Sequence, residues 1–558
     1  MPAGPRDALV FAPLGGVGEI GMNLSIYGVG DPGSRTWLAI DLGVSFASEE
    51  HLPGVDLIFP DIRYLVEERK NLLAIVLTHA HEDHFGALFD LWPRLKVPVY
   101  ATPFTAALIE AKRQSEPGAP DIAVKVVPLG ARFTLGPFDI EFVSVAHSIP
   151  ESNALILRTR HGTVLHTGDW KLDPTPVIGL PTDEAKLRAL GDEGVLALIG
   201  DSTNAVREGR SPSETDVART LTELVAKARG RVAITTFASN VARLRSAALA
   251  AQATGREVVV VGRAMERVVQ VARETGYLEG VQDFRGFDAY QGLPRDRVLA
   301  LCTGSQGEPR AALARIAEAQ HPTVTLDKGD QVIFSSRTIP GNEKEVGRVM
   351  NGLVRQGIEV ITDRTHLVHV SGHPRRAEME EMYGWVRPRI VVPVHGEAVH
   401  LAEHAAIARG LGIQEVVLCE NGDVVRLAPG PAAVVDEVPA ARIYKDGMLL
   451  IEADARTVPD RRRLSFGGFV SVALAVTRKA ELAADPEVEL IGIPENNAGG
   501  ESMADIAYEA ALSTFEQLPR ARRNDPDALA ESVRGAVRSA IAQHWGKKPM
   551  CFVHVLSV

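Results

Sequence analysis

The stretch LAIVLTHAHEDHFGALFDLW, residues 73–92, holds four possible metal ligands within six positions: His79, His81, Asp83 and His84. The apolar run at its start is typical of a buried strand, and the residues after the ligands are typical of the beginning of a helix. We therefore expect the four side chains to cluster on a turn between a strand and a helix. Neutral imidazole and carboxylate suit Zn²⁺ or Mn²⁺, and the close spacing lets one turn serve two adjacent ions. A solvated polar turn would explain neither the density of histidines nor the strand before them.

Two ions require about seven or eight protein ligands, so other segments must complete this group. Three candidates each follow a predicted strand directly: His147 after FDIEFVSVA, Asp169 after TVLHTG, and His395 after RIVVPV. Polar residues at strand ends lie on loops that a rigid sheet positions, which is where catalytic groups are usually found. Each of the three alone is more simply explained as a structural polar residue. Together with residues 79–84 they form a consistent ligand set.

The length of 558 residues predicts three or four structural units, at about 150 residues per domain. Apolar residues make up 45% and charged residues 23%, the balance of a globular chain rather than of a disordered one. The start of the chain lacks a basic segment followed by an apolar run, and no apolar run is long enough to span a bilayer, so we expect neither a secretory signal nor a membrane anchor. Three widely separated cysteines, Cys302, Cys419 and Cys551, argue against a disulfide framework and favour the cytoplasm.

The formal net charge of -11 disfavours sequence-independent coating of nucleic acid, because phosphate binding needs clustered Lys and Arg. A local basic channel is still compatible with this charge. The candidate clusters are Arg461 to Arg463, Arg520 with Arg522 and Arg523, and Arg375 with Arg376. Each cluster alone is more simply explained as a solvated surface.

The pattern of apolar and polar residues along the chain changes near residue 211. Before it, short apolar runs broken by Gly, Pro and Asp predict strands, whereas afterwards helices alternate with buried strands and predict an inserted α/β unit with a parallel sheet. The first pattern, of short apolar runs, then returns. A Pro- and Ala-rich passage follows it and precedes a final segment with a helical stretch near Asp527 to His544. The expected divisions are a first domain at 1–210 that resumes at 361–430, an inserted domain at 211–360, a linker at 431–447 and a C-terminal domain at 448–558.

The pattern His-x-His-x-Asp-His with the later His147, Asp169 and His395 resembles the metallo-β-lactamase superfamily. The inserted unit is similar to that of its β-CASP branch. GDSTNA with Asp201, HVSGH ending at His373, PLGGVGEIGMN near the start and CTGSQGEP all resemble the ribonuclease J family. The resemblance implies an α/β fold, with a metallo-β-lactamase αββα sandwich, an inserted β-CASP α/β domain and a small α+β C-terminal domain.

The resemblance also implies how the ligands divide between two Zn²⁺ ions per subunit, with Mn²⁺ as the alternative. One metal would take His79, His81 and His147, the other would take Asp83, His84 and His395, and Asp169 would bridge them. Asp41, which ends the strand TWLAID, would orient a ligand, although a loop-capping aspartate explains it equally well.

The implied reaction is phosphodiester hydrolysis, in which two cations about 3.5 to 4 Å apart activate a water and stabilise charge on phosphorus. Asp83 would belong to the catalytic group. His373 would be the general acid for the leaving 3′ oxygen, and Asp201 would tune the site nearby.

Two segments would bind RNA phosphates according to the same resemblance. The first consists of His369, Val370, Ser371, Gly372 and His373, where small residues allow a close approach. The second consists of Thr236, Phe237, Ala238 and Ser239 in TTFASN, and it is similar to the place where the family holds an RNA 5′ monophosphate. Ser239 or Asn240 could cap a helix there, and helix N-termini bind anions. The alternatives are core or surface histidines in the first segment and an ordinary helix cap in the second.

GVGEIG at 16–21 fits the dinucleotide fingerprint GxGxxG, with Asp41 twenty positions beyond it. Such a fingerprint must open a helix, whereas the residues that follow predict a strand, a Gly/Pro turn and another strand. We expect these glycines to permit a tight turn beside the metal site rather than to bind a nicotinamide cofactor.

The function implied is that of a metal-dependent ribonuclease in the cytoplasm, acting in rRNA maturation and mRNA decay. It would degrade single-stranded RNA from 5′-monophosphate ends in the 5′-3′ direction, with endonuclease activity as a further capacity, as a homodimer or homotetramer. Two alternatives stay open: a related hydrolase of DNA or of a small ester, and a catalytically silent RNA-binding scaffold. The inserted domain disfavours a small substrate, and the intact ligand set disfavours the silent scaffold.

Overall fold

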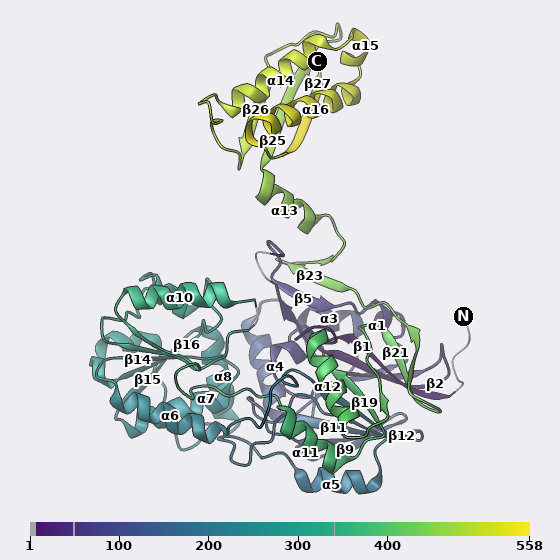
Figure 1. Ribbon diagram of the computed structural model, residues 1–558, viewed down its shortest axis with the longest axis vertical. Coiled ribbons are helices and arrows are strands. Elements are labelled where there is room, and N and C mark those ends of the chain that lie inside the picture. The colour runs from purple at the N-terminus through teal and green to yellow at the C-terminus, as the bar shows by residue number, and fades with distance from the viewer. Residues whose placement is uncertain (1–6, 48–50, 340) are drawn as a thin grey trace. The chain divides into compact units, whose positions relative to one another are not determined.

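The computed structural model describes residues 7–47, 51–339 and 341–558, and Figure 1 shows the course of the chain. The chain divides into two compact units. The first comprises the described residues up to Ile443 apart from 47–56, and the second comprises Ala47–Asp56 and Tyr444–Val558. The expectation about a secretory signal concerns residues 1–6 in part, and these lie outside the described residues.

Two β-sheets of the first unit face each other across a buried apolar layer. Side chains alternate along each strand, so that Leu9 and Phe11 enter this layer while Val10 and Ala12 pack on the opposite face of the same strand. The first sheet has the spatial order β22 (Ala433–Glu437), β21 (Asp423–Ala428), β1 (Ala8–Gly15), β2 (Leu24–Gly30), β3 (Thr36–Ile40), β6 (Leu72–Val76), β7 (Val99–Ala101) and β8 (Val124–Val126). The second has the order β20 (Glu415–Val416), β19 (Ile390–Val394), β13 (Ala197–Asp201), β12 (Gly162–His166), β11 (Asn153–Thr159), β10 (Phe138–Ser144) and β9 (Arg132–Leu135).

Helices cover the outer faces of both sheets. Leu91 and Phe104 are among the helical residues that pack on the first sheet, and Leu187 and Met379 are among those that pack on the second. The helices on the first sheet are α1 (Arg63–Glu67), α3 (Leu88–Leu95) and α4 (Pro103–Ser115), and those on the second are α5 (Glu184–Glu193), α11 (Arg376–Val386) and α12 (Ala398–Gly410). The arrangement confirms the predicted αββα sandwich.

The inserted unit lies between two strands that are neighbours in the second sheet. β13 and β19 pair in parallel, from Ala197 opposite Ile390 to Asp201 opposite Val394. Parallel neighbours need a crossover connection, and here the crossover contains a whole domain. Asp201 and His395 are therefore brought to the same edge of the sheet although they are far apart in the sequence.

The insert is built around a five-stranded parallel sheet, as the alternating helices and strands predicted. Its order is β15 (Glu257–Val261), β16 (Val298–Cys302), β14 (Val232–Thr235), β17 (Gln331–Phe334) and β18 (Glu359–Ile361). The accompanying helices are α6 (Glu214–Lys227), α7 (Val241–Ala253), α8 (Arg263–Glu274), α9 (Ala312–Ala317) and α10 (Glu343–Arg355), with short 3₁₀ turns η1 (Phe287–Gly292) and η2 (Arg295–Arg297). Apolar residues of α6, α7 and α8 pack on one face of this sheet, and those of α9 and α10 pack on the other.

The segment 431–447, expected as a linker, contains regular structure. Residues Ala433–Glu437 form β22, which pairs antiparallel with β21 and extends the first sheet, and Arg442–Asp446 form β23. The many prolines and alanines of LAPGPAAVVDEVPAA predicted a linker, but the segment also contains the short apolar run Ala-Val-Val. That run is long enough to form an edge strand. The linker reading is thus wrong for these residues, and the other domain boundaries remain predictions.

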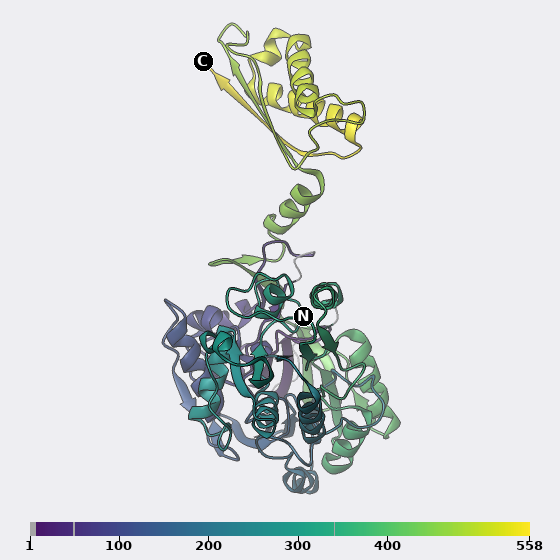
Figure 2. The ribbon, with the colours of Figure 1, turned by 90° about the vertical axis from the view of Figure 1, so that its left-hand side faces the viewer.

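The second unit contains a three-stranded sheet with helices on one of its faces, as Figure 2 shows. The strands are β26 (Glu487–Ile491), β25 (Phe469–Val476) and β27 (Met550–Ser557), and the helices that pack on them are α14 (Met503–Gln517) and α16 (Pro526–Trp545). Val470, Val472 and Leu474 alternate toward these helices and are fully buried. The small α+β C-terminal domain is therefore confirmed. The remaining elements of the chain are α2 (Glu82–Phe85), α13 (Thr457–Gly467), α15 (Arg520–Arg523), β4 (Ser45–Phe46), β5 (Leu57–Pro60) and β24 (Leu449–Glu452).

A buried ion pair lies within the insert, and its arginine also contacts the segment that follows the insert. Arg243 on α7 and Glu214 at the start of α6 lie 3.1 Å apart with their side chains 0% and 1% exposed. The Arg243 guanidinium also donates to the backbone carbonyls of Ser335 and Val368, each at 2.8 Å.

Replacing Glu214 with Gln leaves the Arg243 charge buried without its counter-ion. We expect this variant to lose about 3–5 kcal/mol of the free energy of unfolding, measured by urea denaturation. Glu184→Gln breaks an exposed pair with Arg188 and should cost less than about 1 kcal/mol. Equal stability of the two variants would contradict the structural role of the buried pair.

Candidate metal centre

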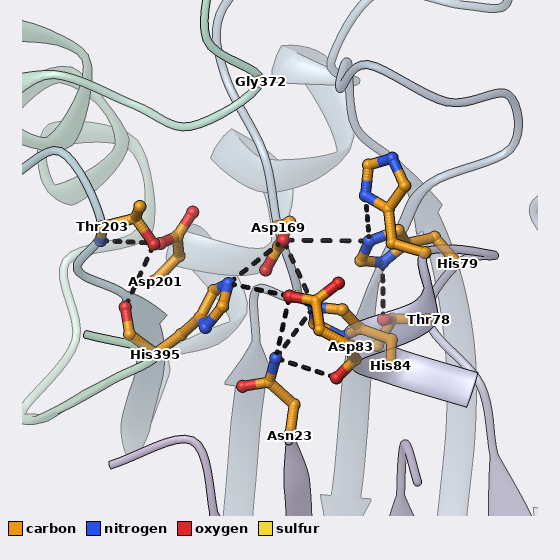
Figure 3. Close-up of polar contacts among 12 residues, drawn as sticks. Asn23, Thr78, His79, Asp83, His84, Asp169, Asp201, Thr203, Gly372 and His395 are labelled. Atoms are coloured by element: carbon orange, nitrogen blue, oxygen red, sulfur yellow. Dashed lines mark hydrogen bonds and ion pairs between the residues drawn. The ribbon is translucent and has the colours of Figure 1, made fainter. Parts of the chain in front are cut away.

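The ligands expected from the sequence come together at one edge of the sandwich. His79 and His81 lie on the loop after β6, whereas Asp83 and His84 lie inside the short helix α2 rather than on the turn. His147, Asp169 and His395 follow β10, β12 and β19. Figure 3 shows the side chains of His79, His84 and His395, which come from separate segments, around Asp169.

The first group of ligands consists of His79, His81, His147 and Asp169, whose ligand atoms all lie within 4.8 Å of one another. His81 Nδ1 lies 3.0 Å from His79 Nε2 and 3.0 Å from His147 Nε2. Asp169 Oδ2 lies 3.8 Å from His79 Nε2 and 3.7 Å from His147 Nε2. Ring nitrogens that converge in this way direct lone pairs to a common point, which fits a cation.

The second group consists of Asp83, His84, Asp169 and His395, again within 4.8 Å. Asp169 Oδ2 lies 3.2 Å from His84 Nε2 and 3.3 Å from His395 Nε2. Both ring nitrogens of His395 are buried without a hydrogen-bond partner among the described residues. A buried polar atom rarely stays unpaired, so the donor set fits a second cation that shares Asp169 with the first.

In three of the rings, those of His79, His84 and His147, Nδ1 lies within hydrogen-bond distance of a partner that fixes the orientation of the ring. His84 Nδ1 donates to Asp41 Oδ2 at 2.7 Å, and the Thr78 hydroxyl donates to the same carboxylate while lying 3.0 Å from His79 Nδ1. His147 Nδ1 donates to the Gly372 carbonyl at 2.7 Å. Such partners leave Nε2 of each ring free to bind a metal. Asp41 thus contacts His84, one of the candidate ligands, rather than only capping a loop.

Two residues of the site have left-handed backbone conformations. Asp41 has φ of 63° and His395 has φ of 52°. Residues other than glycine rarely adopt these angles, and such strain gathers at functional sites. The conformations turn both side chains from the ends of their strands toward the cluster.

The two groups differ in their protonation. Burial, followed by the neighbouring imidazoles, lowers the pKa of His79 and His81 well below the usual range, and burial lowers the pKa of His147 to about 4. Burial also acts to lower the pKa of His84, but the carboxylates of Asp169, Asp83 and Asp41 outweigh it and raise that pKa well above its usual value. The three imidazoles of the first group are therefore neutral and can bind a cation, whereas a cation that binds to His84 in the second group must displace a proton.

The residues expected to handle protons also meet in the structure. His373 Nδ1 donates to Asp201 Oδ2 at 2.7 Å and lies 3.8 Å from Asp169 Oδ2. Its side chain is 19% exposed, whereas those of His79, His84, His147 and His395 are at most 4% exposed. His373 can therefore reach both the cluster and a molecule bound from solvent.

The two segments expected to hold phosphates lie on either side of Ser335. The Ser335 backbone N–H donates to the carbonyl of Thr235, the first residue of TTFASN, and the Ser335 hydroxyl donates to Val368 O, beside His369. Thr236 Oγ1 and His369 Nδ1 are buried without a hydrogen-bond partner among the described residues. Phe237, Ala238 and Ser239 form the turn before α7, and Val370 is buried next to Ser371 and Gly372. The side chain of Asn240, not of Ser239, caps α7 by accepting from Arg243 N.

Sequence reasoning missed several polar residues around the cluster. Asn23 Nδ2 lies 3.1 Å from both Asp83 O and His84 Nε2. Thr203 donates its hydroxyl to His395 O, and Asn204 donates to Ser371 Oγ. Asn23 ends the motif PLGGVGEIGMN and Thr203 and Asn204 belong to GDSTNA, so both motifs carried the signal without showing what these side chains contact.

The glycine-rich run at 16–21 forms a turn between two antiparallel strands, β1 and β2, and no helix follows it. Gly16, Gly18 and Gly21 all have positive φ, and Val17 bridges to Gly396 beside His395. The glycines thus lie in a loop of residues 16–23 beside the His/Asp cluster, longer than the tight turn expected, and the absence of a helix after them in the described residues argues against a dinucleotide site.

Gly372 tests the support of the first group. A Cβ atom at this position would lie 2.4 Å from His147 Nδ1, so Gly372→Ala must displace the ring. We expect a loss of about 10- to 100-fold in metal affinity, measured by competition with a chelator. Gly384→Ala, at a helical glycine with open space around it, provides the control and should leave the affinity unchanged. Unchanged affinity in Gly372→Ala would remove His147 from the ligand set.

Comparison with known proteins agrees with this geometry. Residues 35–263 match the metallo-beta-lactamase superfamily, and residues 357–418 match the Zn-dependent metallo-hydrolase RNA specificity domain. Residues 229–353 match the ribonuclease J beta-CASP domain, and residues 456–558 match the ribonuclease J C-terminal domain. A ribonuclease J from Sinorhizobium meliloti is 54% identical over 99% of this chain and 98% of its own length. The chain belongs to the ribonuclease J family. These matches, with the His/Asp cluster, support a metal-dependent ribonuclease.

More distant relatives extend over the whole chain as well. Ribonuclease J of Mycobacterium tuberculosis is 38% identical over 100% of this chain and 99% of its own length, and that of Thermus thermophilus is 35% identical over 98% and 95%. A solved structure of a protein of unknown function from Enterococcus faecalis has a TM-score of 0.52 at 16% identity, covering 75% of this chain and 100% of that one, and it shows the fold alone. Among the described residues, no helix combines the length and apolar character needed to cross a membrane.

Proposed function

We propose that this ribonuclease J family member is a two-metal ribonuclease that degrades single-stranded RNA in the 5′-3′ direction from 5′-monophosphate ends and also cuts internally. The observation that carries the proposal is the pair of ligand groups that share Asp169. We further propose two Zn²⁺ per subunit, with Mn²⁺ as the alternative, because imidazole and carboxylate suit both. The first would be held by His79, His81 and His147, and the second by Asp83, His84 and His395.

When bound, the two cations supply Lewis acidity: they activate a water and stabilise the charge that develops on a phosphodiester. Asp169 and Asp83 contribute the negative charge that holds them. Asp41 and the Gly372 carbonyl keep His84 and His147 in the tautomers that direct Nε2 to the cations. His373, held by Asp201, protonates the leaving 3′ oxygen.

The preference for a 5′ monophosphate would come from the two segments joined through Ser335. Thr236 Oγ1 and His369 Nδ1 are buried polar atoms without a partner among the described residues, and the start of α7 adds backbone N–H groups near Ser239. His369, Val370, Ser371, Gly372 and His373 would hold a neighbouring phosphate, and Thr236, Phe237, Ala238 and Ser239 would hold the terminal one. Anchoring of the end favours repeated cleavage from that end.

The test is cleavage of matched oligonucleotides by the metal-replete chain. We expect faster turnover of 5′-monophosphorylated RNA than of 5′-hydroxyl RNA, with mononucleotides as the first products, and little turnover of DNA of the same sequence. Equal turnover of RNA and DNA would favour the DNA-directed alternative. Metal binding without cleavage of any oligonucleotide would favour the silent RNA-binding scaffold.

The biological setting belongs to the same proposal. The chain would act in the cytoplasm in rRNA maturation and mRNA decay, as a homodimer or homotetramer. Sedimentation of the full chain tests the assembly, since a monomer at all concentrations would contradict it.

A further inference from the structure

Three arginines gather beside the loop that carries His369 and His373, and the proposed function gives them no role. Arg207 lies on the loop after β13, Arg337 follows β17 of the insert, and Arg375 caps α11. All three are half-buried.

Hydrogen bonds from backbone and side-chain donors bring the three loops together. Arg376 N donates to Arg207 O at 3.0 Å, which places Arg375 next to Arg207. Ser335, two residues before Arg337, donates its hydroxyl to Val368 O at 2.6 Å. Asn204, three residues before Arg207, donates its side-chain amide to Ser371 Oγ at 2.9 Å and to His373 O at 3.1 Å. The loop from Val368 to His373 is therefore flanked by the segments that carry the arginines.

The guanidinium groups have little negative charge to balance them. In the part of the chain that the structure describes, the side chains of Arg207 and Arg375 make no hydrogen bond or ion pair, and Arg375 Nε is buried without a partner. The closest carboxylate of Arg337 is Asp363, with Oδ2 at 4.0 Å from Nε. Their neighbours differ: Arg210 pairs with Glu381 at 2.5 Å, and Arg376 pairs with Glu208 at 3.1 Å.

The three charges also act on one another. Burial, and then the guanidinium groups of Arg337 and Arg375, lower the pKa of Arg207. Burial and Arg375 also lower the pKa of Arg337, against the opposing effect of Asp363. Clustered like charges repel, and a bound anion relieves that repulsion. In a chain of net charge -11, such a concentration of unpaired positive charge selects for an anionic ligand.

We propose that Arg207, Arg337 and Arg375 form a binding site for an internal phosphodiester of the RNA strand, next to the phosphate that His369 and Ser371 would hold. The inference rests on the proposed function for its substrate. Guanidinium groups match phosphate oxygens with paired hydrogen bonds, which suits a strand whose backbone carries one such group per nucleotide. The terminal phosphate is assigned to the turn at Thr236–Ser239, so the arginines serve a phosphate further along the strand.

The test measures binding separately from cleavage. Anisotropy of 3′-labelled single-stranded RNA is recorded with the full chain in EDTA over a series of salt concentrations, using 5′-phosphorylated and 5′-hydroxyl RNA. Each of R207Q, R337Q and R375Q is expected to weaken binding about tenfold. Each should also reduce the slope of log affinity against log salt by about 0.7, the value for one phosphate contact on a single strand.

The two RNAs distinguish an internal phosphate from the terminal one. An internal contact predicts equal losses on both, whereas losses confined to 5′-phosphorylated RNA would assign the arginines to the terminal phosphate and overturn the proposal. The Lys variants at the same positions keep the charge and should restore the slope, while R210Q, which removes an already paired arginine, should change neither slope nor affinity. Unchanged slopes in all three Gln variants would also overturn it.

The outcome is independent of the proposed activity. If the salt slope of RNA binding depends on the arginines but the chain does not cleave RNA, the proposed function would be wrong and the proposed phosphate site would still be supported. If the chain cleaves RNA but the Gln variants keep the same salt slope, the proposed function would be supported and the phosphate site would be wrong.

Discussion

Replacing Asp169 with Asn is expected to lower the rate of RNA cleavage about a thousandfold or more. One oxygen of this carboxylate lies 3.2 Å from His84 Nε2, 3.3 Å from His395 Nε2 and 3.7 Å from His147 Nε2. Asparagine keeps the shape but removes the charge that both ligand groups share. Two cations supply several kcal/mol of transition-state stabilisation. Because about 1.36 kcal/mol corresponds to a tenfold change in rate, the loss of this stabilisation accounts for the expected thousandfold decrease.

Two measurements are needed for this variant, because a slow enzyme and a metal-free enzyme are different results. Metal content per chain, determined by mass spectrometry, should fall together with the cleavage rate. Asp192→Asn, which removes a carboxylate whose side chain is 79% exposed, should change neither. An Asp169→Asn chain that keeps two ions and normal turnover would rule out a bridging role.

Replacing His373 with Ala is the second large effect, and it should leave the metal content intact. General acid catalysis contributes about 10²- to 10⁴-fold, so turnover should fall within that range. Burial acts to lower the pKa of His373, but the carboxylates of Asp201 and Asp169 outweigh it and raise the pKa to about 9. The two carboxylates therefore favour the protonated ring, which can give a proton to a leaving oxygen.

The metal content decides between two readings of His373. Asp169, Asp201, His373 and His395 also place ligand atoms within 4.8 Å of one another, which would suit a ligand role. A His373→Ala chain that loses an ion would show that His373 binds metal instead of donating a proton. Retained metal with reduced turnover supports the general acid.

The pH profile gives an independent check through Asp201. A general acid works while protonated, so its contribution is lost as the pH rises through its pKa. Bound cations repel the proton and lower that pKa, whereas Asp201 raises it. Asp201→Asn should therefore move the alkaline limb of turnover to lower pH, and Asp192→Asn should not move it. An unmoved limb in Asp201→Asn would separate Asp201 from His373.

Local patterns were enough to predict the candidate ligands and the parallel sheet of the insert, whereas the αββα sandwich was implied by the family resemblance. His79, His81, Asp83 and His84 are close in space because they are close in sequence, so a strand followed by a helix start already defined them. Strand ends marked His147, Asp169 and His395, because hydrophobic runs reveal strands and a sheet places their ends along one edge. Alternation of helices and strands likewise predicted the parallel sheet of the insert.

The pairing of residues across the sandwich was decided only by the tertiary structure. The Gly372 carbonyl holds His147 across 225 positions of sequence, and Asn23 reaches His84 across 61. β22 joins a sheet through backbone hydrogen bonds, and its proline-flanked sequence does not predict this pairing. In the sequence, Arg207, Arg337 and Arg375 resemble ordinary surface arginines. Only the hydrogen bonds that hold their three loops together show that they lie in one region.

The physical reason is the range of the interactions. Periodicity and spacing record which side chains of one element share a face, and so residues 79–84 could be predicted as metal ligands from the sequence itself. Charge balance, ring orientation and the number of unpaired groups depend on neighbours from other elements, which only the folded chain supplies. The sequence therefore determined the candidate metal-binding residues and the resemblance to nucleases, whereas the fold decided which carboxylate both groups share and which arginines have little negative charge beside them.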